Sequence, residues 1–487
     1  MVLVKGENMI KHIFSYLPGR LIPAALNFVM LAIYARLLSV NEYGSYALIL
    51  AMSSFISSVG YIWIRMYLER FYQYYVKENN EIYILNSIKT NFILVSISVI
   101  IISISIQILI PKYIEKWLFI VALVYTIFSA LFEIILSLYR AKLKPNIYSS
   151  LSILKSLIVL VSSFLFIYYL NFGVIGVFIS LILGNSVVIV LIILKKDKSI
   201  YTLNRNSIIF NNEFLKYGLP FIMTFLLSYI ITVSDRFFIR YFGSEELVGS
   251  YSISYDLSSQ TLNMLFMVVN LAAYPIIVKA LETENVNQVK KSIIQYSSLS
   301  LGVLIPSTLG FIILSPDISL LVIGNKFGGD VVTILRYTAI STFILGLKAY
   351  FSDFSFQLGK RTDLQIYPMV VGAILNICLN IVLIPKFQII GALYSTLISF
   401  TSSLLLSLFL GRKVFKMYIN YRDLYKIIIS AIIMYLCIDI FSYQRITWFN
   451  LILKITVGII AYGISVYVLN VSNIKLYIKN TIVKEKM

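Results

Sequence analysis

The residues that could do chemistry in this chain are charged side chains that stand inside or beside long apolar runs. The clearest stretch is YGLPFIMTFLLSYIITVS from Tyr217, which leads into Asp235 and Arg236, and the next apolar run carries Asp256. An ionisable group in hydrocarbon costs on the order of 2.5–3.5 kcal/mol by insertion scales, so it normally faces a protein interior or a water-filled path. This stretch is therefore a candidate for binding a charged solute or a coupling ion.

Three cations inside apolar runs could compensate the charge of an anionic ligand. Lys155 lies roughly 14 Å inside its run at 1.5 Å per residue, which is too deep for its ammonium to reach the surface fully. Ser152 and Ser162 share its side of a helix and would extend a hydrated wall. Arg20 and Lys348 are the other two cations, although Arg20 is shallow enough to reach the membrane surface instead. We predict that Lys155, Arg20 and Lys348 bind substrate.

Five further charged residues inside or beside these runs, four acids and one arginine, indicate gating or ion coupling. Glu133 and Asp353 fall at similar distances before the ends of their runs, and Asp235, Arg236 and Asp256 join them as candidates. Two structural alternatives stay open. Asp235 and Arg236 could form a salt bridge that latches two helices, and Lys155 could pair with Glu133 on the adjoining run.

The composition is that of a polytopic membrane protein. Hydrophobic residues make up 59% of the 487 residues, charged residues only 13%, and the mean hydropathy is +0.88, which together exclude an ordinary soluble protein. Continuous Ile, Leu and Phe runs also lack the alternation of outer-membrane strands. We expect an all-helical fold.

Apolar length predicts about fourteen transmembrane helices. Polar connectors divide them into an N-terminal six-helix lobe (1–205), a C-terminal six-helix lobe (206–415) and two further helices with a cytoplasmic tail (416–487). The expected spans are 13–37, 43–64, 87–110, 117–139, 146–170, 172–194, 216–241, 247–275, 292–315, 331–357, 365–385, 388–410, 427–443 and 447–469.

The net charge of +19 reflects membrane topology and not nucleic-acid binding. Lys and Arg occur in the short connectors between spans and form no single basic patch. Connectors after even-numbered spans are rich in Lys and Arg and the others are poor. The positive-inside rule then places both termini in the cytoplasm.

The two predicted lobes repeat each other in sequence. EYGSYA at 42–47 matches LVGSYS at 247–252, NFGVIGVFIS at 171–180 matches KFQIIGALYS at 386–395, and AKLKPNIY at 141–148 pairs with GKRTDLQIY at 359–367. Three matches in one order indicate a duplicated six-helix unit. Since each copy has an even number of spans, the copies should be related by an axis along the membrane normal.

Catalytic and metal-binding signatures are absent from the sequence. We find no phosphate-cradling glycine loop, no His and Cys cluster and no large acidic external loop. We therefore expect no enzyme activity, no cofactor and no metal site, with H⁺ or Na⁺ as the candidate coupling ions.

Several motifs resemble a known family. YGLP at 217–220, SDRFFI at 234–239, VGSYSISY at 248–255, GNKF at 324–327 and ARLLS followed by EYGSYAL are similar to the polysaccharide-exporter branch of the multidrug/oligosaccharidyl-lipid/polysaccharide (MOP) flippase superfamily. The nearest relatives in this resemblance are the Wzx-type flippases of O-antigen (lipopolysaccharide) and capsule repeat units. The motifs mark the family better than the substrate.

The resemblance implies two pseudo-symmetric six-helix lobes around a central cavity. It also implies that undecaprenyl-pyrophosphate-linked oligosaccharide crosses the bacterial cytoplasmic membrane by alternating access, with membrane lipids and polysaccharide polymerase or assembly proteins as further partners. In its terms, Arg20, Lys155 and Lys348 would receive the pyrophosphate and sugars. The alternatives are a lipid II-type flippase, a multidrug cation exporter of the same superfamily, and a membrane polysaccharide polymerase or ligase.

Overall fold

The computed structural model describes residues 18–109, 116–194, 212–283, 286–328, 330–441 and 445–475. These residues form helices throughout, and no β-strand occurs among them. The expected all-helical fold is confirmed. The single histidine of the sequence, His12, and the polar connector at 195–211 between the two predicted lobes lie outside the described residues.

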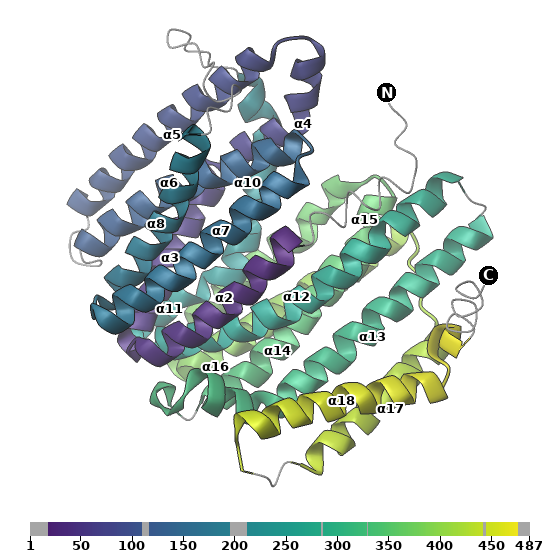
Figure 1. Cartoon of the computed structure of the whole chain (residues 1–487). Helices are drawn as coiled ribbons and strands as arrows, with labels where there is room; N and C mark the ends of the chain where they lie inside the picture. Colours follow the sequence, from purple (N-terminus) through teal and green to yellow (C-terminus); the bar gives the residue numbers. More distant parts are fainter. Residues whose placement is uncertain are drawn as a thin grey trace. The chain divides into compact units, whose positions relative to one another are not determined.

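The chain divides into two compact units, 1–237 and 238–487. Figure 1 labels the helices of both units. The first unit contains α2 (Pro18–Leu37), α3 (Val40–Gly60), α4 (Ile62–Lys77), α5 (Glu81–Leu109), α6 (Lys116–Ala141), α7 (Pro145–Phe164), the π-helix η1 (Leu165–Tyr169), α8 (Gly173–Leu194) and α10 (Asn212–Val233).

The boundary between the units falls within α11 (Asp235–Phe242). The second unit continues with α12 (Glu245–Thr283), α13 (Val286–Ile318), η2 (Ser319–Ile323), η3 (Asn325–Phe327), α14 (Val331–Leu347), η4 (Lys348–Ser352), α15 (Phe354–Leu358), η5 (Thr362–Gln365), α16 (Ile366–Val414), α17 (Tyr421–Asp439), α18 (Trp448–Val468) and η6 (Val471–Asn473).

Helix α10 packs against α3 and α4, so most of the seventh predicted span (216–241) belongs to the first packing unit. The repeat boundaries at 205 and 415 describe duplicated sequence and stay a prediction.

Many of these helices are long enough to cross a bilayer. In the described part of the chain, ten helices have sufficient length and apolar character, and an eleventh span results if α10 and α11 count as one. The kinked α16 contains two predicted spans, 365–385 and 388–410, and changes direction at Gln388 (φ 49°). The total of fourteen stays a prediction.

The backbone carries similar landmarks at the predicted repeat positions. Ser39 caps α3 by accepting a hydrogen bond from the Glu42 amide (3.2 Å), and Ser244 Oγ accepts one from the Leu247 amide (3.3 Å) at the start of α12. Each serine stands five residues before the glycine of its motif, Gly44 or Gly249. Serine is a preferred N-cap because its oxygen satisfies a free backbone amide.

A second landmark lies three residues before Gly176 and before Gly391. Gly173 has φ +51° and Gln388 has φ +49°. At Gly173 a Cβ would also lie too close to a carboxylate oxygen of Glu42, so glycine is favoured there. These paired landmarks support the predicted duplication.

Candidate transport site

Lys155 is a half-buried cation in the first unit, held within α7. Its ammonium lies 4.4 Å from the ring centroid of Phe132 on α6, a distance suited to a cation–π contact. Among the described residues no carboxylate pairs with it. A ring face compensates only part of a full positive charge, so this ammonium retains capacity for an anion.

Glu133, the expected structural partner of Lys155, is engaged elsewhere. Its Oε2 accepts from Arg65 on α4 at 2.9 Å, and the two side chains are 35% and 22% exposed. Arg65 therefore joins α4 to α6. The direct ion pair expected between Lys155 and Glu133 is therefore not formed, and the ligand-binding role of Lys155 stays a prediction.

The surroundings of Lys155 contain buried polar atoms without a hydrogen-bond partner among the described residues. A Cβ on Gly184 would meet the Lys155 carbonyl oxygen at 3.3 Å, which shows that α8 passes directly beside this lysine. The next residue, Asn185, is fully buried, and neither polar atom of its side chain has a hydrogen-bond partner among the described residues. Ser152 Oγ is also buried and has no hydrogen-bond partner among the described residues. Buried polar groups are normally satisfied by protein or water, so water or a ligand would stabilise this region.

Arg20 lies on α2, which runs beside α7. Gly19 packs against Ser149, and Tyr34 Oη lies 2.8 Å from Ser163 Oγ, so the two helices are parallel. Arg20 is half-buried and, within the described residues, forms no hydrogen bond or ion pair. It lies near the start of α7, with Lys155 roughly 8–9 Å further along at 1.5 Å per residue. The helix continues through Pro23 without a break.

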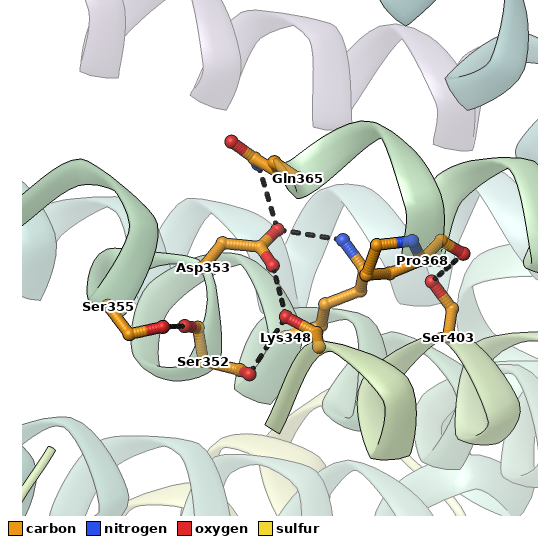
Figure 2. Close-up of polar contacts among 8 residues, drawn as sticks. Lys348, Ser352, Asp353, Ser355, Gln365, Pro368 and Ser403 are labelled. Carbon is orange, nitrogen blue, oxygen red and sulfur yellow. Dashed lines mark hydrogen bonds and ion pairs between the residues drawn. The ribbon is translucent and has the colours of Figure 1, made fainter. Parts of the chain in front are cut away.

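Lys348 has a different environment in the second unit. It begins the π-helix η4, is buried, and its Nζ donates to Asp353 Oδ2 at 2.7 Å (Figure 2). Asp353 also accepts from Gln365 Nε2 (3.0 Å) and from Ser407 Oγ (2.6 Å). The carboxylate thus neutralises the ammonium inside a closed network. The cargo-binding role of Lys348 stays a prediction, while its pairing with Asp353 suits a coupling or gating role.

Asp235 and Arg236 occupy a helix break. The chain bends by 45° between α10 and α11, and both side chains are buried, at 1% and 7% exposed. Asp235 is the first residue of α11, where a negative charge stabilises the helix dipole. Asp256 is half-buried in α12. The roles of all three in gating or coupling stay predictions.

Another buried pair was not predicted from the sequence. Lys454 Nζ on α18 donates to both oxygens of Asp317 on α13, at 2.8 and 3.0 Å, with side chains 4% and 6% exposed. The sequence signal was present, because Lys454 stands within the last apolar run as Lys155 does within its own. In the described residues no group of three or more metal-ligating side chains is found.

The sequence matches, over residues 33–332, the family described as "Polysaccharide biosynthesis protein". The chain belongs to this family. Two archaeal relatives from Haloferax volcanii carry flippase names. The "Probable flippase AglR" is 27% identical over 34% of this chain and 35% of its own length. The "Probable low-salt glycan biosynthesis flippase Agl15" is 24% identical over 49% of this chain and 50% of its own length. The chain therefore spans half or less of the length of these two relatives.

The fold of this polysaccharide-biosynthesis family member is similar to that of a solved flippase structure. A solved structure titled "Lipid II flippase MurJ, inward closed conformation" is similar, with a TM-score of 0.73 at 18% identity over 93% of this chain and 98% of that one. The resemblance read from the motifs is confirmed. The chain is a multi-pass membrane protein, and two of its relatives are named as flippases.

Proposed function

We propose that this chain is a flippase that moves an undecaprenyl-pyrophosphate-linked oligosaccharide from the inner to the outer leaflet of the bacterial cytoplasmic membrane. Both termini would lie in the cytoplasm, transport would proceed by alternating access, and H⁺ or Na⁺ would couple through the embedded acids. The family description and the glycan-flippase name of one relative support a lipid-linked saccharide as cargo.

One observation carries this proposal: the ammonium of Lys155 contacts the Phe132 ring and has no carboxylate partner among the described residues. A pyrophosphate carries about two negative charges and cannot enter hydrocarbon without compensation. A cation deep in a span is costly unless it has a polar partner, a water-filled path or a ligand. With Glu133 held by Arg65, Lys155 is available to a phosphate group, and Arg20 lies on the neighbouring helix.

The test is glycan export by Lys155 variants in a strain that lacks the native gene. Outer-leaflet lipid-linked oligosaccharide is measured by its reaction with a membrane-impermeant oxidant. We expect Lys155→Ala to lower export about tenfold or more, because a charge-assisted contact is lost. Lys155→Arg should retain part of it, because the charge survives with another geometry.

The controls separate binding from structure. Lys89→Ala removes an exposed lysine of α5 in the same unit and should leave export unchanged at equal protein level. Exchanging Lys155→Glu with Glu133→Lys would place a lysine beside Arg65 and should fail. Full export by this exchange variant would show that the cation is structural and would overturn the assignment.

The rival cargo is a peptidoglycan precursor, since the MurJ structure shares this fold. Both cargoes carry a pyrophosphate, so Lys155 does not distinguish them. Comparison of the two lipid-linked substrates in the same leaflet assay does. A cation exporter is disfavoured because Lys155 and Arg20 would repel its substrate.

A further inference from the structure

An aromatic pocket with one cation lies on α4 of the first unit, away from Lys155. Its volume is about 320 Å³, and it is lined by Tyr67, Arg70, Phe71, Tyr74 and Tyr75. These positions follow the helical spacing i, i+3, i+4, i+7 and i+8, so one face of α4 supplies all five. The volume is at the lower end of the range for small-ligand sites and suits one or two sugar rings.

The aromatic walls are held in place by their neighbours. Phe71 lies 4.5 Å from Tyr67 and 5.1 Å from Tyr217 on α10, measured between ring centroids. The phenol oxygens of Tyr67 and Tyr75 are 3.2 Å apart, and Tyr75 stacks on Tyr83. Figure 1 shows α4 and α10 in the first unit, where they pack together. Tyr74 is 59% exposed and forms an open rim.

Arg70 supplies the pocket with an available positive charge. It is exposed and, within the described residues, has no ion pair. Two acids near it in the sequence have other partners: Glu69 pairs with Arg140 at 2.8 Å, and Glu81 accepts from Tyr72 Oη at 2.6 Å. A planar guanidinium binds phosphate through paired hydrogen bonds.

Rings and guanidinium together specify an anionic saccharide. The electron-rich face of an aromatic ring attracts the positively polarised C–H groups of a sugar, while Arg70 matches a phosphate attached to it. We propose that this pocket binds the glycosyl phosphate part of the cargo at the cytoplasmic end of α4, before the cargo reaches Lys155. This inference rests on the proposed function for its cargo and its topology.

The test measures binding without transport. The full-length chain in phosphatidylcholine nanodiscs is titrated calorimetrically with glucose 1-phosphate, glucose and inorganic phosphate. We expect glucose 1-phosphate to bind about tenfold tighter than either fragment, because it uses both the rings and the guanidinium. Arg70→Gln should weaken it about tenfold. Tyr74→Ala should weaken binding of glucose 1-phosphate about threefold to tenfold without changing the affinity for inorganic phosphate.

Lys77→Gln is the matched control, since it removes an exposed cation from the same helix without touching the pocket. Equal loss in this variant, equal binding of sugar phosphate and inorganic phosphate, or no binding by the wild type would overturn the inference. Failure of the wild type in the leaflet assay with normal binding here would instead reject the proposed function and leave the pocket standing.

Discussion

Lys155 and Lys348 are both lysines within apolar spans, yet their surroundings differ. Lys155 faces the Phe132 ring, whereas Lys348 is paired with Asp353 inside a network that includes Gln365. A buried ion pair stabilises little by itself, but removing one partner leaves an uncompensated charge. The difference supports the proposed ligand binding at Lys155 and suggests that a conformational or coupling role for the Lys348–Asp353 pair is the one to test.

Asp353→Asn tests that coupling role at the residue scale. The substitution removes the negative charge beside Lys348, so we expect slower export with cargo binding retained. The measurement combines the leaflet assay with binding of lipid-linked oligosaccharide to purified protein. The double variant Lys348→Met with Asp353→Asn removes both charges and should stay folded. Export at the wild-type rate by the double variant would show that the pair has only a structural role.

At the scale of elements, helix breaks coincide with polar residues. The 45° bend between α10 and α11 directly precedes Asp235, and the turn within α16 occurs at Gln388 with a positive φ. A broken helix frees backbone groups that lipid cannot satisfy, so breaks inside a membrane are tolerated where protein or water surrounds them. In the proposed transport cycle, these two positions are therefore suited to shape changes.

The last helix is joined to α13 by the Asp317–Lys454 pair. Asp317→Leu alone should lower the free energy of unfolding by about 3–5 kcal/mol, because it leaves the buried Lys454 charge without its partner. The double variant with Lys454→Met should recover most of the loss. Heating in detergent followed by fluorescence-detected gel filtration reports the loss in the single variant and the recovery in the double variant as shifts in the melting temperature.

The exposed pair Arg361–Asp363 is the matched control for this element. Its side chains are 57% and 61% exposed, so Asp363→Leu should leave the melting temperature unchanged. If Asp317→Leu alone melts like the wild type, the pair does not secure α18.

At the scale of the whole molecule, the predicted topology places both termini in the cytoplasm. Reporter fusions after Asn171 and after Ile200 should report opposite sides of the membrane, because the connector after Asn171 is poor in Lys and Arg and the one around Ile200 is rich. Matching signals from the two fusions would contradict both the topology and the even-numbered repeat. The same fusions test the cytoplasmic location proposed for the Arg70 pocket.

The sequence by itself determined the helical membrane fold, the embedded charges and the family. Apolar length and the need to satisfy backbone hydrogen bonds in lipid are local properties, so they can be read along the chain. The tertiary structure decided which side chains the charged residues contact. Glu133 pairs with Arg65, Lys155 faces the Phe132 ring, and Lys454 pairs with Asp317. It also placed α10 with the first unit and gathered the α4 rings around Arg70. Partners depend on which helix faces meet, and helices that are alike in hydropathy do not encode their neighbours in any local pattern.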